Sequence, residues 1–316
     1  MLAAVLASVF MAVVMCNDRI FLSAGDEPVL SDPMQLLVVS SFLPAFSLVW
    51  ALSGGLPSIP TIYVLGAFLA GTLWTISNAA FFAATKITTD FDEVATWDAS
   101  SPGFIALIGI PFGITLIPRY WVGIAIMAGS LLALRYAFKG RAQVENKTLY
   151  YGLLVLHVGA LTGTMFGFDF LLKWLGEGHY SSLYVSYLGG QAVGFLALLW
   201  PSVRRNFVAD APKIRRFWPA LVLGEVSYVI SLTMMTWAMK GYPGAVVMAL
   251  QGTYPLIIMG FGELIRRIEF FRRFGDMQVA FPPQEGERWK KLTILIANVF
   301  AHGLLTPQTT PKLRHG

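Results

Sequence analysis

The sequence predicts an all-α integral membrane protein with about ten transmembrane helices, arranged as two inverted five-helix repeats. Composition is the first observation behind this fold class: hydrophobic residues make up 56% of the 316 residues and charged residues 13%, with a mean hydropathy of +0.63. A soluble globular chain carries about 25% charged residues. The other two observations are long apolar runs without charges and similarly placed prolines in the two halves of the chain.

Charge-free runs locate the spans, because about 20 apolar residues are needed to cross a hydrocarbon core of about 30 Å. Residues 34–85 contain no Asp, Glu, Lys or Arg, and the segment SGGLPSIPT in their middle predicts a turn between two helices. Unbroken runs of this length favour helices over the short alternating strands of a barrel. The expected spans are residues 2–21, 34–53, 60–84, 93–113, 119–138, 149–172, 181–200, 217–239, 243–263 and 290–306.

An internal repeat relates the two halves of the chain. Pro102 follows Lys86 by 16 residues, and Pro255 follows Lys240 by 15. Each proline is expected inside an apolar helix, where it frees a backbone carbonyl that neighbouring helices or a cavity must satisfy. Five spans per repeat invert the second copy, an arrangement that recurs in transporters. The predicted organisation is a first repeat at residues 1–141, a second repeat at 148–306 and a polar C-terminal tail at 307–316.

These features resemble the EamA-type members of the drug/metabolite transporter superfamily. The resemblance rests on five plus five spans, a proline in the fourth and ninth, and the Gly-containing fifth span VGIAIMAGSLL, and it covers nearly the whole chain. In the family a Gly-Glu-Arg-like turn often follows the proline-bearing helix. Glu269 fills that place after Pro255, whereas Leu116 stands at the same distance from Pro102 and departs from the pattern. The resemblance implies a ten-helix carrier that moves small metabolites by alternating access.

Basic residues predict the orientation of the chain. Of the 23 Lys and Arg residues, 17 fall in the loops after the third, fifth, seventh and ninth expected spans, and five fall on the opposite side. The positive-inside rule places the odd-numbered loops in the cytoplasm and both termini outside. The family resemblance, in contrast, implies that both termini lie inside. If the first span does not cross the membrane, nine spans remain and the N-terminus alone returns inside. The side of the N-terminus therefore stays open. The expected location is a plasma or inner membrane.

Two polar residues stand at related positions of the repeat. Asp98 lies four residues before Pro102, and Gln251 lies four residues before Pro255. We expect Asp98 to bind a cationic or amine-bearing substrate, or a proton, and Gln251 to hydrogen-bond the same ligand. In the alternative, the fourth span begins near Ser100 and Asp98 is solvated. It would then belong to an acidic loop with Asp90, Asp92 and Glu93.

Three further polar residues fall inside expected spans. Glu225 is placed about 12 Å into the eighth span, a depth at which an ionisable group indicates function. His157 in the sixth span suits a proton relay, although an imidazole hydrogen-bonded between packed helices is the favoured interpretation. Asn78 in the third span is expected either in a polar cavity or bonded to a neighbouring helix.

Other charged or small residues are expected to be structural. Asp169 and Lys173 have the spacing of an ion pair on one helix face. Asp18 and Arg19 are expected to snorkel toward the interface at the end of the first span. The glycine-rich segments GAFLAG and LGGQAVG predict close helix packing.

The sequence excludes several classes of protein. One cysteine, Cys16, excludes an intrachain disulfide and a Cys-rich metal site. HExxH, Walker A and GxSxG motifs are missing, and the four histidines are scattered, so we expect no enzyme, no cofactor and no metal. The net charge of +5 reports orientation and not binding to nucleic acid.

The predicted function is secondary transport of a small amino acid, amine or drug-like metabolite by alternating access, with proton-coupled export as one form. The alternative is a non-transport membrane scaffold or a channel-like protein. The expected partners are a small-molecule substrate and the lipid bilayer, and a homodimer is left open. Carboxylates in the spans favour cationic substrates, since phosphate esters would predict buried basic residues.

Overall fold

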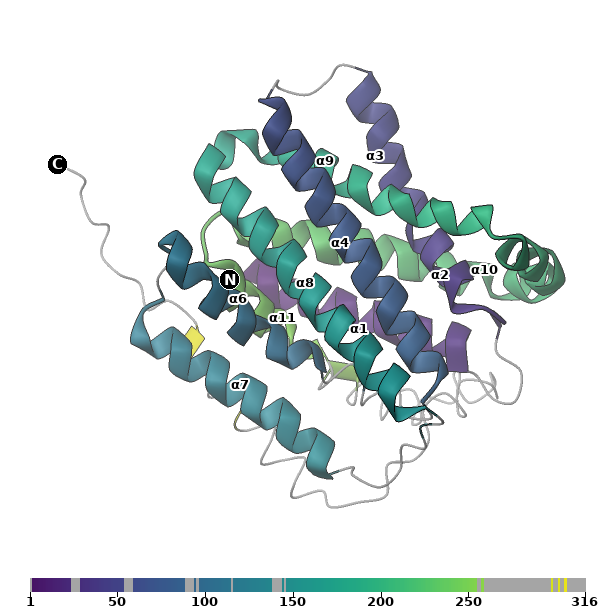
Figure 1. Ribbon diagram of the computed structural model, residues 1–316, viewed down its shortest axis with the longest axis horizontal. Coiled ribbons are helices and arrows are strands. Elements are labelled where there is room, and N and C mark those ends of the chain that lie inside the picture. The colour runs from purple at the N-terminus through teal and green to yellow at the C-terminus, as the bar shows by residue number, and fades with distance from the viewer. Residues whose placement is uncertain are drawn as a thin grey trace.

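The computed structural model is a bundle of α-helices (Figure 1). It describes residues 2–23, 29–53, 59–88, 94, 97–114, 116–137, 144, 146–254, 257–258, 297, 301 and 304–305. Among these residues the single β interaction is an isolated antiparallel bridge between Thr88 and Val144. The all-α fold class is therefore confirmed.

Each expected span as far as residue 251 contains at least one helix, although several bounds differ. The α-helices are α1 (Leu2–Ser23), α2 (Pro33–Ser40), α3 (Phe42–Leu52), α4 (Thr61–Lys86), α6 (Ser101–Gly109), α7 (Pro118–Ala137), α8 (Lys147–Leu175), α9 (Tyr180–Gln191), α10 (Pro201–Ala238) and α11 (Gly244–Gln251). Short 3₁₀ helices are η1 (Trp97–Ser100), η2 (Ile110–Phe112), η3 (Glu177–His179) and η4 (Ala192–Leu199). The predicted span 290–306 and the tail 307–316 lie almost wholly outside the described residues, as does Glu269.

Four helical segments in the described part of the chain are long and apolar enough to cross a membrane. They are Thr61–Lys86, Lys147–Leu175, Glu177–Leu199 and Pro201–Ala238. Shorter apolar helices cover Leu2–Asp18, Pro33–Phe46 and Ser101–Phe112. By length and composition, these segments are consistent with a multi-pass membrane protein.

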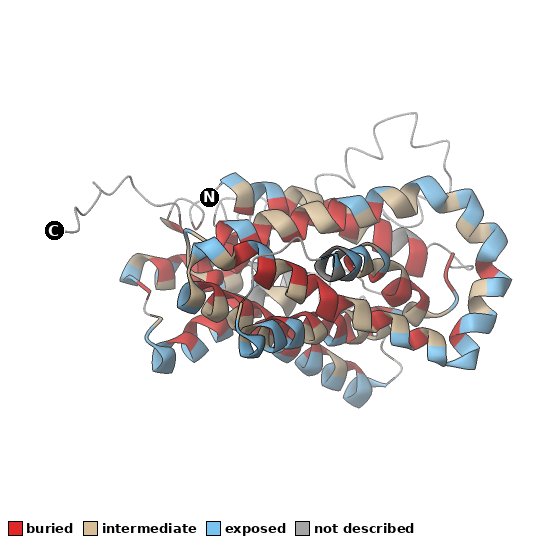
Figure 2. Ribbon diagram, turned by 90° about the horizontal axis from the view of Figure 1, so that it is seen from above, coloured by how far each residue is buried: buried red, intermediate tan, exposed pale blue. Residues whose placement is uncertain are grey.

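Large apolar side chains also cover the outside of the bundle. Ile62 and Leu69 of α4 and Val155 of α8 are each more than half exposed. Figure 2 shows the general pattern, with buried residues facing the interior of the bundle and exposed ones facing outward. Contact with lipid tails would remove these apolar groups from water.

The predicted span 34–53 is divided at Ser41. The helix begins with a capping box, in which the Asp32 side chain accepts from Met34 N and the Gln35 side chain accepts from Asp32 N. At its end, the Ser41 hydroxyl donates to the carbonyl of Leu37 at 2.8 Å. A serine that bonds back to the preceding turn bends or ends a helix. The sequence prediction of one continuous helix is corrected accordingly.

Helix α10 begins 16 residues before the predicted span 217–239. It has 38 residues and would be about 57 Å long if straight. Pro201 stands in the first turn, where its missing N–H is not needed. Pro212 and Pro219 lie inside the helix and are expected to bend it. In Figure 1 its first turns, at the right, are seen almost end-on, whereas the rest crosses behind α4.

The early start of α10 corrects the loop predicted after the seventh span. The basic residues assigned to that loop stand on helical backbone, and they are Arg204, Arg205, Lys213, Arg215 and Arg216. Arg and Lys have high helix propensity, so a basic segment continues a helix readily. A helix can also extend beyond the hydrocarbon core, which a count of apolar residues does not detect.

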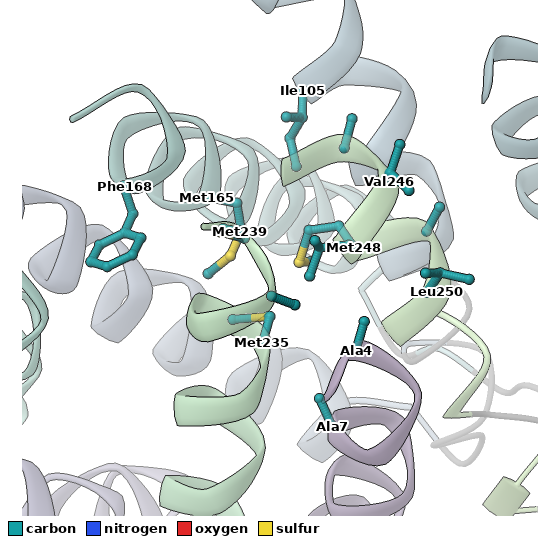
Figure 3. Packing of buried hydrophobic residues seen from close by; sticks show 14 of the residues in the cluster. Ala4, Ala7, Ile105, Met165, Phe168, Met235, Met239, Val246, Met248 and Leu250 are labelled. Atoms are coloured by element: carbon teal, nitrogen blue, oxygen red, sulfur yellow. The ribbon is translucent and has the colours of Figure 1, made fainter. Parts of the chain in front are cut away.

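The helices pack around a core formed by both halves of the chain. Helix α4 packs along α8 and α9, and α1 packs along α10. In Figure 1 α4 and α8 run side by side in front, and α1 and α10 lie behind them. Figure 3 shows side chains from α1, α6, α8, α10 and α11 meeting in this core, among them Ala7, Ile105, Met165, Met235 and Leu250.

Two glycines allow α4 and α9 to cross backbone to backbone. A Cβ atom on Gly71 would overlap the carbonyl of Tyr187, and one on Gly190 would overlap the carbonyl of Phe68. Gly71 belongs to the segment GAFLAG and Gly190 to LGGQAVG. The predicted packing role of these segments is confirmed.

Candidate functional site

A cavity of about 50 Å³ lies between helices from both halves of the chain. All five polar residues predicted for a substrate or proton pathway line it: Asn78, Asp98, His157, Glu225 and Gln251. They come from α4, η1, α8, α10 and α11. Since one water needs about 10–15 Å³ by this kind of measure, the cavity has room for a few waters or a small polar group.

Asp98 and His157 are directly bonded at the wall of the cavity. Oδ1 of Asp98 lies within hydrogen-bonding distance of Nε2 of His157. The second carboxyl oxygen, Oδ2, accepts from the hydroxyl of Tyr254 at 2.6 Å. The side chain of Asp98 is 13% exposed and that of His157 is 5% exposed. Asp98 is therefore not solvated, although α6 begins only at Ser101, close to the start that the alternative prediction gave. The residues Asp90, Asp92 and Glu93 lie outside the described residues.

The other side of the imidazole is held by Ser77 of α4. Nδ1 of His157 lies 3.0 Å from the carbonyl oxygen of Ser77 and 2.8 Å from its hydroxyl oxygen. A carbonyl only accepts, so the first contact is a hydrogen bond when Nδ1 carries a proton. The Ser77 hydroxyl then donates to the carbonyl of His157, at 3.1 Å. In that tautomer the contact between Nε2 and Asp98 needs a proton on one of its two atoms. In the other tautomer Nδ1 accepts from the Ser77 hydroxyl, and Nε2 carries the ring proton and donates to Asp98.

The geometry agrees with the structural interpretation of His157, and the proton relay stays a prediction. Its ring is packed between helices, with the ring of Phe81 at a centroid distance of 5.2 Å. It also bonds to a carboxyl group on the cavity, which a purely structural histidine does not require. Sequence reasoning named both residues but not their contact.

Pro102 stands in the first turn of α6, and the prediction that it lies inside a helix is corrected. It has no N–H for the carbonyl of Asp98, four residues earlier. The hydroxyl of Ser101 donates to this carbonyl at 2.5 Å. The proline thus frees a carbonyl as expected, and a neighbouring side chain satisfies it. Pro255 lies outside the described residues.

Glu225 and Gln251 present polar atoms without a protein partner. Oε2 of Glu225 and Oε1 of Gln251 are buried and have no hydrogen-bond partner in the described structure. Gln251 is 3% exposed and is the last residue of α11. A buried acceptor without a partner costs about 1–3 kcal/mol. The amide oxygen of Gln251 only accepts, and so do the oxygens of Glu225 in its carboxylate form, so a group that fills the cavity beside them would have to donate hydrogen bonds.

Asp18 is a cavity residue that sequence reasoning missed. It was expected to snorkel with Arg19, whose side chain lies outside the described part of the structure, but it is 6% exposed and lines the cavity. Helix α1 continues five residues past Asp18, so the carboxyl group does not stand at a helix end. Met11, Val14 and Asp18 share one helical face at spacings of three and four. This spacing is the sequence signal that could have placed Asp18 at the cavity.

The pair Asp169 and Lys173 has a structural role, as expected. Lys173 Nζ donates to Oδ2 of Asp169 at 2.8 Å, which confirms the predicted ion pair. The same oxygen accepts from the backbone N–H of Gly244 at 3.0 Å, in the first turn of α11. Asp169 of α8 therefore caps the helix that carries Gln251.

Among the residues that the structure describes, no group of three or more His, Cys, Asp and Glu side chains could hold a metal ion. The described lining residues of the cavity include three carboxyl groups and no Lys or Arg. This donor set attracts cations and hydrogen-bond donors.

Comparison with known proteins gives no relative for this chain. The sequence matches no model of a known protein family, and a search among curated proteins finds no similar chain.

Proposed function

We propose that this protein is a secondary transporter of small amine-bearing metabolites that works by alternating access. The observation that carries the proposal is the cavity, where five polar side chains from five separate elements meet among apolar helices. Polar groups are costly inside a membrane and are retained chiefly where substrates or ions pass. In this proposal, the chain forms a ten-helix carrier of two inverted five-helix repeats, similar to EamA-type transporters.

The charge of the cavity supports a cationic substrate. Asp18, Asp98 and Glu225 supply carboxyl groups, and none of the described lining residues is basic. A phosphate ester or a carboxylate would find no basic partner among these described residues. Amines and the ammonium groups of amino acids fit the same walls, since they donate hydrogen bonds and carry positive charge.

The bonded pair of Asp98 and His157 supports coupling to protons. Loss of the proton that the two residues share leaves one negative charge at the wall of the cavity. A cation that enters the cavity favours this loss by Coulomb attraction, which is stronger beside largely buried groups than in bulk water. Uptake of the amine on one side and release of a proton on the same side would give exchange, and hence export driven by a proton gradient.

Counterflow in proteoliposomes tests the proposal. A thermal-shift screen of the purified protein against primary amines, amino acids and quaternary ammonium ions first identifies stabilising ligands. Labelled ligand is then added outside vesicles that hold the unlabelled form. A carrier gives saturable uptake that is stimulated from the opposite side. A channel gives flux without this stimulation, and a scaffold gives no stabilising ligand and no flux, and either result contradicts the proposal.

A further inference from the structure

The oxygens of Asp98 already have partners in the protein. Oδ1 bonds to His157, Oδ2 accepts from Tyr254, and the backbone carbonyl accepts from Ser101. A ligand that used this carboxyl group as its main anchor would have to compete with these contacts. The most obvious acidic residue of the cavity is therefore poorly placed as the substrate anchor, and it is well placed to hold a proton.

The hydrogen-bond acceptors of the cavity that lack a donor lie on other helices. Oε2 of Glu225 on α10 and Oε1 of Gln251 on α11 are buried acceptors that no donor of the described residues reaches. The Gln251 side chain is 97% removed from solvent, and both residues line the cavity. Two acceptors left open on separate helices around a common space indicate a missing donor.

Asp18 adds a second carboxyl group to this part of the site. Helix α1, which carries Asp18, packs along α10, which carries Glu225. Asp18 is buried, and it interacts electrostatically with Glu225. Two carboxyl groups, with no basic side chain among the described lining residues, favour a positively charged occupant.

We propose that Glu225, Gln251 and Asp18 form a binding site for a primary ammonium group. The site deepens the proposed transport function by naming its substrate class, and it rests on that function. A primary ammonium group carries one charge and three N–H donors, so it can reach acceptors on three helices at once. Asp98 and His157 then hold the exchanged proton, separate from the substrate anchor.

The open acceptors make the site selective for N–H donors over charge alone. Tetramethylammonium has the same charge as methylammonium but no N–H group, and it would leave both oxygens unpaired. A site built to hydrogen-bond its ligand rejects an analogue that lacks the donor. Tetramethylammonium is also bulkier than methylammonium, and it would have to fit a cavity of about 50 Å³.

Calorimetric titration of the full chain in lipid nanodiscs tests the site, with methylammonium as the probe. We expect saturable binding of methylammonium and binding of tetramethylammonium at least about tenfold weaker. Glu225→Gln should weaken methylammonium binding by at least about tenfold, and Gln251→Met, which removes the open oxygen at similar length, should also weaken it. Glu177→Gln is the matched control, because this side chain is 65% exposed and does not line the cavity.

The proposal is overturned if wild-type protein does not bind methylammonium or binds tetramethylammonium equally well. Unchanged methylammonium binding in a folded Glu225→Gln variant overturns it too. The same holds if Asp98→Asn weakens methylammonium binding as much as Glu225→Gln does, or more. Should Glu225→Gln fail to fold, unchanged binding in Gln251→Met decides against the site. Displacement of methylammonium by equimolar Na⁺ would identify a metal-cation site instead.

The outcomes separate this site from the transport function. If methylammonium binds in a way that depends on Glu225 but no counterflow is found, the ammonium site stands and the transport function is wrong. If a substrate shows counterflow that does not depend on Glu225, the transport function stands and the ammonium site is wrong.

Discussion

His157 of α8 bonds through Nε2 to the carboxyl group of Asp98, 59 residues earlier in the chain. The bond joins α8 to the short element η1 that leads into α6, and it lies on the wall of the cavity. Ser77 of α4 contacts Nδ1 on the other side of the ring, so the imidazole is held with Nε2 toward the carboxyl group.

Asp98→Asn should abolish proton coupling without unfolding the protein. The amide can still donate to Nε2 of His157 and accept from Tyr254, so the local geometry is kept. It cannot exchange a proton at physiological pH. We expect no proton release when a transported amine is added to the protein in weakly buffered solution, and transport at least about tenfold slower. Unchanged transport with unchanged pH dependence would exclude a role for Asp98 in coupling.

His157→Leu should destabilise the protein by about 3–5 kcal/mol, because it removes one partner of a buried pair. The side chain of Asp98 would then lack its partner at Oδ1, and the Ser77 carbonyl would lose its donor. The double variant Asp98→Leu with His157→Leu should recover part of this loss, since no unpaired charge remains. Chemical denaturation of the four proteins of the cycle gives the coupling free energy. Strictly additive losses would show that the two side chains do not act as a pair.

The positions of helices and candidate residues could be predicted from the sequence because both depend on local composition. Charge-free runs gave the helices, and rare polar residues within them gave the cavity lining, including Gln251. The break at Ser41 was not predicted, because the length of the apolar run was judged without the hydroxyl of Ser41, which donates to the carbonyl of Leu37 one turn earlier. Asp18 was missed because depth along a helix was judged by the apolar run alone, whereas α1 continues past it.

Gly71→Ala and Gly190→Ala should each destabilise the crossing of α4 and α9. The added methyl group would meet backbone atoms of the partner helix, which cannot move aside as a flexible side chain can. Overpacking of this kind costs about 1–3 kcal/mol. Gly159→Ala in α8 is the matched control, because no atom lies within 4 Å of its added Cβ, and alanine should stabilise that helix by about 0.5–1 kcal/mol. The thermal unfolding temperatures of the three variants in detergent test this prediction. A stable Gly190→Ala variant would mean that the two backbones are not in contact.

Asp169→Ala should lower both the stability of the fold and the affinity of the cavity for its ligand, because it removes one hydrogen bond. Its Oδ2 atom accepts from the N–H of Gly244, and α11 has only eight residues between this cap and Gln251. Loss of a helix cap costs about 0.5–2 kcal/mol. The displaced α11 would also move Gln251, so methylammonium should bind less tightly, by about threefold or more.

Lys173→Met separates the cap from the ion pair. Lys173 is 36% exposed, so its pair with Asp169 is partly screened by solvent and should contribute little to stability. The backbone contact of Asp169 with Gly244 remains in this variant, and α11 keeps its position. We therefore expect Lys173→Met to bind methylammonium like the wild type, while Asp169→Ala does not. Equal losses in the two variants would assign the effect to the ion pair, and the cap would then have no role in placing Gln251.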